Sequence, residues 1–494
     1  MSKKKDSRAA GTSRRKTTGA SRRNFVKHSG LAAAGLMIVP RHVLGGPGYV
    51  APSDTLNIAG IGVGGKGQSD LSSFAESPNV NIVALCDVDD RQAVAAREAY
   101  PKAKYYEDFR KMLDKEKDDI DAVSVSTPDH NHAVAAYKAM EMGKHVYVQK
   151  PLTHDIWEAR MLTEAAEKFK VVTQMGNQGG SGDGVRKMQE IYDAGLIGEV
   201  QSVQCWTNRA IWPQALETPT EKNKIPKGLN WDLWLGTAEK RDYNDAYLPF
   251  DWRGWSDFGT GALGDMACHI MDPVYRILPI LYPSTVECSI SDAFSGKFET
   301  ADYPKSFPNS STIYLKYPKT DGTGSIDVTW MDGGLRPRRP DELGDDEAFG
   351  NWDGGVLFIG TNGKLLADCY GANPRLLPLT LNEQISVKET IPRVPEGHYL
   401  QWVNACMAGY GNAKTSSSFD YAGPFTESIL IGNLALKSYF EVDPSAENKS
   451  FWGGGKQFWG RKRLNWDAEN MKITNFEPAN KYVKRDYREG YSVG

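Results

Sequence analysis

Short apolar runs alternate with amphipathic segments along the chain between residues 55 and 175. The apolar runs have the length of strands, and they occupy residues 56–61, 80–86, 120–126, 145–148 and 171–175. The intervening segments with helical spacing of apolar residues occupy residues 91–99, 108–115, 133–142 and 155–168. This alternation predicts a doubly wound parallel sheet of the α/β class, with ligands at the carboxyl ends of its strands.

The pattern changes after residue 178. Residues 309–316, 355–359 and 363–366 predict strands of a second sheet, and residues 333–350, rich in Pro, Arg and acids, predict a long loop that is a candidate lid. The bases and aromatic residues near the C-terminus are typical of a surface strap or a subunit contact. We expect four parts: a signal and linker over 1–50, a dinucleotide-binding domain over 51–177, a substrate and oligomerisation domain over 178–451, and a tail over 452–494.

Composition and charge narrow the class of protein. The 494 residues are 40% hydrophobic and 24% charged, which is typical of a globular chain with a sizeable core. The first 50 residues carry 11 Lys and Arg against Asp6, so the overall charge of −3 leaves about −13 for the remainder. This excess of acids argues against nucleic acid as a partner. No apolar run has the ~18 residues of a membrane span, and the six cysteines include no C-x-x-C pair.

The basic N-terminus contains an export motif. Residues 21–27, SRRNFVK, precede an apolar stretch at 31–39 that is too short to cross a membrane. The segment resembles a twin-arginine signal, and a basic tail is the alternative. The resemblance implies export of an already folded chain, with any cofactor loaded, to the periplasm or beyond.

A glycine-rich turn follows the first predicted strand and precedes a helix. In this G-x-G-x-x-G arrangement, Gly62 allows the tight turn, Gly64 lets the backbone approach a pyrophosphate, and Gly67 allows the helix to pack closely on the sheet. The free amides of the helix start then face the anion. We therefore assign to the cofactor site Gly62, Val63, Gly64, Gly65, Lys66 and Gly67.

An acidic residue ends the second strand. Asp87 lies twenty residues after Gly67, where a carboxylate accepts hydrogen bonds from the ribose hydroxyls of adenosine. A carboxylate there favours NAD, because it repels the 2′-phosphate of NADP. Arg91 is near enough in sequence to weaken this preference, so NADP stays as the alternative.

Three further motifs complete a family pattern: T-P-D-H-N-H at 127–132, K-P at 150–151, and G-x-x-x-D-x-x-x-H from Gly261 to His269. Together with the glycine turn they resemble the Gfo/Idh/MocA oxidoreductases. The resemblance implies an N-terminal Rossmann domain and a C-terminal α/β domain with an open, predominantly antiparallel sheet that often joins subunits. It also implies a sugar or polyol substrate and a nicotinamide cofactor. Gln149 replaces the glutamate of the usual E-K-P, so an ion pair made by that glutamate is lost.

The chemistry is expected at Lys150 and on a predicted helix that continues to residue 278. Asp265, His269 and Asp272 follow at i, i+4 and i+7, on one helical face. By resemblance, the catalytic residues are Lys150, Asp265 and His269. Oxidation of a hydroxyl needs a base and a cation beside its oxygen. His269 is the better base near neutral pH, Lys150 stabilises the alkoxide or relays the proton, and Asp265 orients the hydroxyl or the imidazole.

Other polar and aromatic side chains are assigned to the same cleft. We expect Thr127, Pro128, His130 and also Lys150 on the cofactor side, and we expect the substrate to meet His132, Asn177, Asp272 and Trp252. The H-x-H pair offers too few ligands for a metal, so we predict none. Six tryptophans between residues 206 and 255 suggest a saccharide platform or, for each one, a core position.

These features support an exported, NAD-dependent oxidoreductase acting on a sugar, polyol or glycoside. The alternative is a redox-neutral glycosidase or lyase that oxidises a ring hydroxyl, eliminates a substituent and reduces the ketone again. A non-enzymatic binding module is the third class, but the presence of all three catalytic residues argues against it. We also expect a homo-oligomer joined through the C-terminal sheet.

Overall fold

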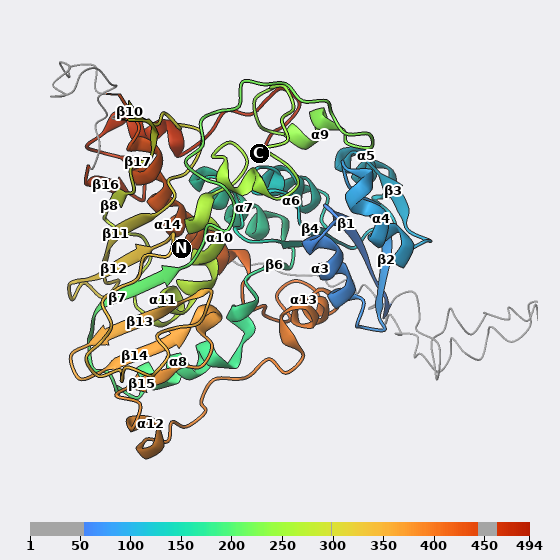
Figure 1. Ribbon diagram of the computed structural model, residues 1–494. Helices are drawn as coiled ribbons and strands as arrows, with labels where there is room; N and C mark the ends of the chain where they lie inside the picture. The colour runs from blue at the N-terminus through green and yellow to red at the C-terminus, as the bar shows by residue number, and fades with distance from the viewer. Residues whose placement is uncertain (1–53, 298, 443–461) are drawn as a thin grey trace, which may run out of the picture. The chain divides into compact units, whose positions relative to one another are not determined.

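The computed structural model describes residues 54–297, 299–442 and 462–494, which belong to one compact unit (Figure 1). The predicted signal of residues 1–50 lies outside the described residues. Within the described part of the chain, no helix combines the length and the apolar character that crossing a membrane requires.

The N-terminal half forms a six-stranded sheet in the order β3-β2-β1-β4-β5-β6. Its strands are β1 (Leu56–Ile61), β2 (Val80–Cys86), β3 (Lys104–Tyr106), β4 (Ala122–Val125), β5 (His145–Val148) and β6 (Thr173–Met175). Its helices are α3 (Lys66–Phe74), α4 (Asp90–Ala99), α5 (Phe109–Glu116), α6 (His132–Glu141) and α7 (Ile156–Phe169). All neighbouring strands are parallel, so the predicted doubly wound sheet is confirmed.

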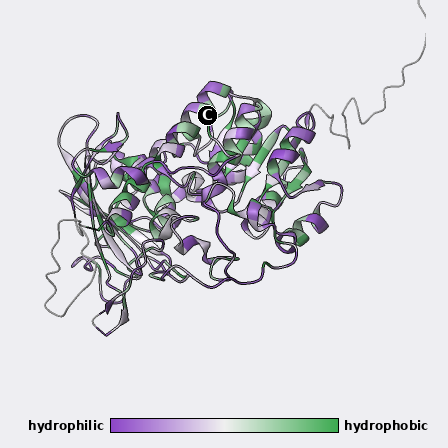
Figure 2. Ribbon diagram, turned by 90° about the horizontal axis from the view of Figure 1, so that it is seen from above, coloured by the Kyte–Doolittle hydropathy of each residue, from purple (hydrophilic) through white to green (hydrophobic). Residues whose placement is uncertain are grey.

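The local sequence explains these elements. β4 is buried along its whole length, as a central parallel strand must be. α7 begins with a capping box between Asp155 and Glu158 and ends at Lys170 in the left-handed conformation. In Figure 2 the helices carry both hydrophobic and hydrophilic stretches, which fits helices that pack one face on a sheet.

The second sheet has nine strands in the order β15-β14-β13-β7-β12-β11-β8-β16-β17. They are β7 (Val200–Thr207), β8 (Thr285–Ile290), β11 (Ser311–Pro318), β12 (Ser325–Met331), β13 (Gly354–Gly360), β14 (Lys364–Asp368), β15 (Arg375–Leu377), β16 (Leu464–Asp467) and β17 (Lys472–Ile473). β7 and β12 are parallel, and the other neighbouring pairs are antiparallel. The expected predominantly antiparallel sheet is therefore confirmed, and β9 (Phe294–Gly296) and β10 (Glu299–Thr300) form a separate hairpin.

Helices fill the space beside this sheet (Figure 1). α14 contacts α7 of the first domain, α10, and strand β8 of the second sheet, so it links the two layers. The remaining helices are α8 (Asp183–Asp193), α9 (Trp231–Leu235), α10 (Gly261–Ile270), α11 (Asp272–Ile277), α12 (Leu381–Gln384), α13 (Gly397–Ala408) and α14 (Phe419–Ser438). Short 3₁₀ turns are η2 (Asp129–Asn131), η3 (Gln178–Ser181), η4 (Asp251–Gly254), η5 (Cys369–Gly371) and η6 (Glu477–Tyr482).

Two predictions about the second half are wrong. The helix expected to continue to residue 278 is two helices, because α10 ends at Ile270 and Pro273 stands in the first turn of α11. The loop at 333–350 is no lid. Its Leu343 packs with Trp206, Leu357, Leu366 and Leu377 against the second sheet, and the Phe349 ring lies 4.5 Å from that of Trp206.

Candidate active site

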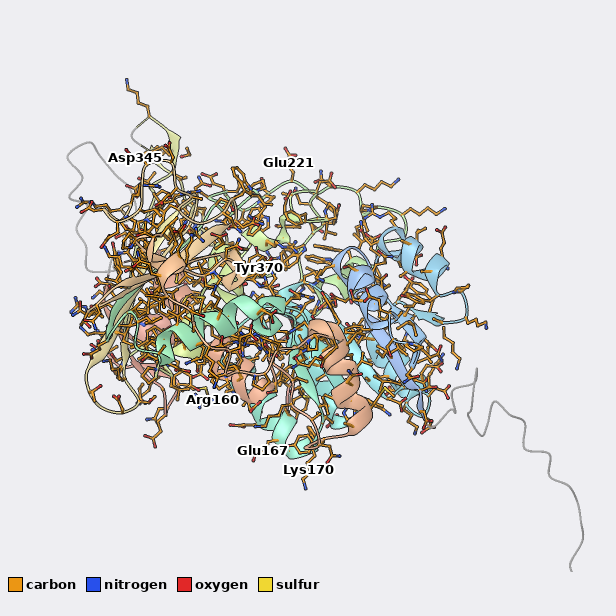
Figure 3. The ribbon with its side chains drawn as sticks, turned by 90° about the horizontal axis from the view of Figure 1, so that it is seen from below. Arg160, Glu167, Lys170, Glu221, Asp345 and Tyr370 are labelled. Carbon is orange, nitrogen blue, oxygen red and sulfur yellow. The ribbon has the colours of Figure 1, made fainter. Side chains whose placement is uncertain are left out.

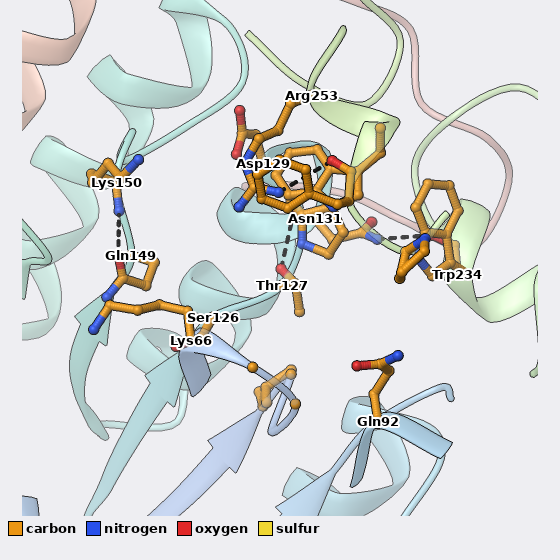
Figure 4. A pocket seen from close by; sticks show the side chains of 18 of the residues that line it. Lys66, Gln92, Ser126, Thr127, Asp129, Asn131, Gln149, Lys150, Trp234 and Arg253 are labelled. Atoms are coloured by element: carbon orange, nitrogen blue, oxygen red, sulfur yellow. Dashed lines mark hydrogen bonds between the residues drawn. The ribbon is translucent and has the colours of Figure 1, made fainter. Parts of the chain in front are cut away.

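A cavity of about 680 Å³ opens where the carboxyl ends of the parallel strands face α10. It is lined by residues of the glycine turn, of the loops after β2, β4 and β5, and of the segment from Arg209 to His269. In Figure 4, Lys66, Gln149 and Lys150 lie on one side of the cavity, and Gln92 and Trp234 lie on the other. Residues from both domains therefore meet at one site, which is the arrangement that a dinucleotide and a second substrate require.

The glycine turn forms the floor of the cavity. Gly62 has φ +75°, which places it in the left-handed region, and a Cβ on Gly67 would lie 1.8 Å from the carbonyl oxygen of Gly62. Gly62, Gly64, Gly65 and Lys66 line the cavity. Val63 and Gly67, which we also assigned to cofactor contact, are buried and do not line it. Their part is to shape the turn.

Asp87 faces the glycine turn from the end of β2. Its carboxylate accepts hydrogen bonds from the backbone amides of Val63 (2.9 Å), Gly64 (3.2 Å) and Asp89 (3.0 Å). Burial raises the pKa of Asp87, and these three amides oppose that effect. Arg91 forms an ion pair with Asp89 at 2.6 Å and does not line the cavity. The positive charge of Arg91, which would favour the 2′-phosphate of NADP, is therefore already paired with Asp89.

Lys150 and Asp265 form an ion pair across the cavity. The Lys150 ammonium donates to the Asp265 carboxylate at 2.6 Å and to its carbonyl oxygen at 3.0 Å, and both side chains are largely buried. Burial on its own would raise the pKa of Asp265, but Lys150 and Arg253 outweigh it and lower the pKa. Asp265 therefore holds the lysine, rather than the imidazole, in position.

His269 lies one helical turn after Asp265 and also lines the cavity. Its Nδ1 is buried and has no hydrogen-bond partner within the described residues, and its ring packs 4.4 Å from that of Tyr370. Burial and the nearby Lys150 lower its pKa well below 6.5. The imidazole is therefore neutral at pH 7 and able to accept a proton.

Gln149 is held by an acidic residue that the sequence did not single out. Its amide nitrogen donates to both carboxylate oxygens of the buried Asp70, at 3.1 and 2.9 Å. The same carboxylate accepts from Ser126 (2.9 Å), Lys66 (2.5 Å) and Tyr399 (3.1 Å). A glutamate at position 149, as in the family pattern, would place a second carboxylate beside Asp70. The glutamine avoids this repulsion because its amide donates hydrogen bonds to Asp70.

The loop after β4 is only partly at the cavity. Thr127 and Pro128 line it, and so does Asp129, which accepts a hydrogen bond from Thr260. His130 does not, because its ring nitrogens lie 3.3 Å and 3.0 Å from the carbonyl oxygens of Phe258 and Trp234. Burial lowers the pKa of His130 to about 3. The structure therefore places His130 behind the residues that line the cavity, and not on the cofactor side where we expected it.

His132 is likewise buried away from the cavity. Its two ring nitrogens each lie 2.8 Å from a backbone carbonyl oxygen, one of Pro151 and one of Thr127. The structure therefore does not bring His132 to the cavity where we expected the substrate. Instead, the side chain ties the loop after β4 to the loop that carries Lys150.

Asn177 and Asp272 belong to a separate buried network. Asn177 donates to Asp272 at 2.8 Å, and Asp272 also accepts from Arg276 (2.8 Å) and Tyr421 (2.9 Å). Neither residue lines the cavity. The structure therefore places both side chains away from the cavity where we expected the substrate, and Asp272 follows the break between α10 and α11.

The tryptophan-rich segment is divided between cavity and core. Trp212, Trp234 and Trp252 line the cavity, whereas Trp206, Trp231 and Trp255 are buried elsewhere. Arg253, which also lines it, lies 4.3 Å above the Trp252 ring. Trp252 therefore lines the cavity, and its contact with a substrate stays a prediction.

Many cavity residues were not predicted, and three of them come from distant parts of the chain. Arg209 is held by Asp353 at 2.9 Å, Tyr370 adopts φ +67° at η5, and Tyr491 comes from the end of the chain. In Figure 3 Tyr370 is labelled near the middle of the projected molecule, whereas Glu221 and Lys170 are labelled near its outline. No local motif marks these residues, because only the folded chain brings them to the site.

Two family models match the chain in succession. Residues 56–177 match the NAD-binding Rossmann fold domain of the GFO_IDH_MocA oxidoreductase family, and residues 182–294 match the C-terminal alpha/beta domain of that family. The predicted cofactor class is confirmed, since the matched first domain binds NAD.

Curated relatives carry glycosidase names. The chain is 31% identical over 202 residues to a Glycosyl hydrolase family 109 protein of Shewanella pealeana, which covers 36% of this chain and 44% of the relative. It is 30% identical over 205 residues to an Alpha-N-acetylgalactosaminidase of Shewanella oneidensis, with the same coverage. The chain thus spans less than half the length of these relatives.

Among solved structures, levoglucosan dehydrogenase in complex with NADH and levoglucosan is similar in fold. It is 18% identical to this chain, with a TM-score of 0.52 over 78% of this chain and 98% of that one. The last likeness shows a shared fold.

Proposed function

Because the chain carries the NAD-binding Rossmann domain and the C-terminal α/β domain of the Gfo/Idh/MocA oxidoreductase family, we propose that it oxidises a hydroxyl of a sugar, polyol or glycoside. One observation supports this best: the Lys150–Asp265 pair, the neutral His269 and the glycine turn all line the same cavity. In the described residues, no other group of side chains places an unpaired base and a cation beside a glycine-rich turn.

The residues present fit a nicotinamide dinucleotide. The glycine turn leaves a floor of backbone that a Cβ would fill, and Asp87 stands at the ribose position of the motif. When bound, the cofactor accepts a hydride from the carbon that bears the hydroxyl. His269 takes the hydroxyl proton, Lys150 stabilises the negative charge that develops on the oxygen, and Asp265 holds the Lys150 side chain in position.

A second candidate is a redox-neutral glycosidase, and the names of the curated relatives favour it. Oxidation of a ring hydroxyl to a ketone acidifies the C–H bond of the neighbouring carbon. After that proton is lost, the substituent on the next carbon leaves and a double bond forms. Water then adds to the double bond, and the ketone is reduced by return of the hydride. The same base and cation serve the oxidation and the final reduction.

One experiment separates the two. The purified protein is incubated with an α-N-acetylgalactosaminide in deuterated water, and the products are analysed by NMR. Free sugar with deuterium at the carbon beside the oxidised one indicates the glycosidase, and an oxo-sugar with reduced nicotinamide indicates the dehydrogenase. Lys150→Ala and His269→Ala should each lower either rate by about 10²–10⁴. Unchanged turnover in both variants would reject this site.

We further propose that the chain is exported by the twin-arginine route. The supporting observation is the SRRNFVK motif at 21–27 in the sequence. Outside the cytoplasm there is no nicotinamide pool, so the cofactor must be held tightly and restored at the same site. This favours reactions in which an oxidation and a reduction are paired.

A homo-oligomer is also proposed, through the second sheet. Tyr314 and Lys316 of β11 and Asp327 of β12 are exposed on one face of this sheet, while the loop at 333–350 covers Leu357 and Leu366 of β13 and β14. The part around β11 and β12 is therefore the surface we expect a second copy to contact. Light scattering on the wild type and on Tyr314→Glu tests this expectation.

A further inference from the structure

The end of the chain returns to the first domain and is anchored there by Arg485. Its guanidinium donates to Glu158 of α7 at 2.7 Å and to the carbonyl oxygen of His130 at 2.5 Å. The Glu158 side chain is fully buried, and it also accepts from Tyr487 at 2.5 Å. Charge-assisted contacts to a buried carboxylate fix this segment firmly against the α6–α7 side of the parallel sheet.

Arg488 connects the same segment to α9 and to the residue that follows this helix. It donates to the Asp232 carboxylate at 2.5 Å, to the Asp232 carbonyl oxygen at 2.7 Å and to the Gly236 carbonyl oxygen at 3.0 Å. Asp232 lies in α9, whose Leu233 and Trp234 line the cavity. The segment therefore joins the first domain to the aromatic wall of the site.

Three residues further on, Tyr491 reaches the cavity itself. Its ring lies 4.6 Å from the guanidinium of Arg110 and 5.6 Å from that of Arg488, and Arg110 also donates to the Gly490 carbonyl oxygen at 3.2 Å. Both cations already have carboxylate partners, Asp108 and Asp232. The ring is thus held in place while one part of it faces the cavity.

The position of Tyr491 identifies which part of a dinucleotide it would meet. Arg110 belongs to α5, which packs on β2 and β3 at one edge of the parallel sheet. Asp87 at the end of β2 lines this part of the cavity together with Glu107 and Phe109, whereas Lys150 follows β5 on the other side of β1. Tyr491 therefore stands at the adenosine end, away from the hydroxyl chemistry.

We propose that residues 485–491 form the outer wall of the dinucleotide site, with Tyr491 against the adenine, and that this wall sets the rate at which NAD leaves. The proposal deepens the proposed function and rests on NAD binding in this cavity. A phenol ring stacks favourably on a purine, and a wall anchored to both domains must give way before the cofactor departs. A slowly released cofactor is what an exported chain would need.

The test measures the release of NADH from the full chain without substrate. Trp212, Trp234 and Trp252 line the cavity, so quenching of tryptophan fluorescence reports binding. Excess NAD⁺ in a stopped-flow mixer then gives the dissociation rate. Tyr491→Ala should release NADH about tenfold faster, which is within the range of aromatic stacking on a base, and Tyr491→Phe should stay within about twofold of the wild type. Arg488→Gln, which loosens the anchor without lining the cavity, should release it about threefold faster.

The matched control is Tyr410→Ala, since Tyr410 is an exposed tyrosine that does not line the cavity. Release from Tyr491→Ala at the wild-type rate, or an equal acceleration in Tyr410→Ala, would overturn the proposal and leave the proposed function standing. If Tyr491→Ala does not fold, Arg488→Gln decides by the same measurement. A wild-type chain that binds no NADH would overturn both.

Discussion

Gln149 and Asp70 show how a change in one motif residue depends on a partner elsewhere in the chain. The glutamine amide donates to both oxygens of a carboxylate that is itself fully buried. We expect Gln149→Glu to place two carboxylates about 3 Å apart, and like charges at that distance cannot both be ionised without cost. The variant should lose about 1–3 kcal/mol of unfolding free energy and part of its kcat, because Lys150 is the next residue.

The double variant Asp70→Asn/Gln149→Glu restores a donor facing a carboxylate. It should recover a substantial part of the loss, as measured by urea unfolding and by kcat on the same preparations. If the double variant is as unstable as the sum of the two single variants, the pairing inferred between these residues is wrong.

His269 gives a prediction about pH. A base works in its neutral form, and burial together with Lys150 lowers the pKa of this imidazole well below 6.5. The imidazole therefore stays neutral as the pH falls through 6.5, and kcat/KM should begin to fall only at a lower pH. His145→Gln is the control, because His145 does not line the cavity. A fall in kcat/KM centred at or above pH 6.5 would contradict this role for His269.

Among the elements, strands and helices of the first domain were predicted within about two residues, except β3. Their apolar runs are short, and the glycine turn and caps mark their ends, so neighbouring residues suffice to specify them. The α10–α11 break was missed although Pro273 marks it. The spacing of Asp265, His269 and Asp272 suggested one continuous helix, but a proline in the first turn of α11 is typical of a new helix start.

The loop at 333–350 provides a prediction at the scale of an element. Leu343 is 3% exposed and packs on the second sheet, and no residue of the loop lines the cavity. Leu343→Ala should lower the unfolding free energy by about 2 kcal/mol and leave the KM for NAD within about twofold. Leu335→Ala, at an exposed position of the same loop, should change stability by less than about 0.5 kcal/mol. A large change in KM for NAD in Leu343→Ala would revive the interpretation of the loop as a lid.

At the scale of the whole molecule, we expect export to depend on the arginine pair of the signal and cofactor binding to be independent of it. Replacing Arg22 and Arg23 with lysine should keep the chain in the cytoplasm, since the paired arginines are the feature that resembles the twin-arginine signal. The retained chain should still contain nicotinamide, because the residues that line the cavity all follow residue 60 in the sequence and do not belong to the signal. Cell fractionation and release of nucleotide from the denatured protein measure the two quantities. Unaltered export of the lysine variant would reject the proposed route.

The parallel sheet and the glycine turn with Asp87 could be predicted from local patterns in the chain, and Lys150, Asp265 and His269 from the resemblance of short motifs to a known family. These depend on backbone preferences and spacings within a few residues. The folded chain was needed to show that His130, Asn177 and Asp272 are buried away from the cavity and that Tyr370 and Tyr491 line it. Whether a side chain meets a ligand or the core depends on segments more than a hundred residues away, such as Trp234 beside His130 and Tyr421 beside Asp272. Patterns within a few residues therefore cannot predict which distant side chains will be the partners.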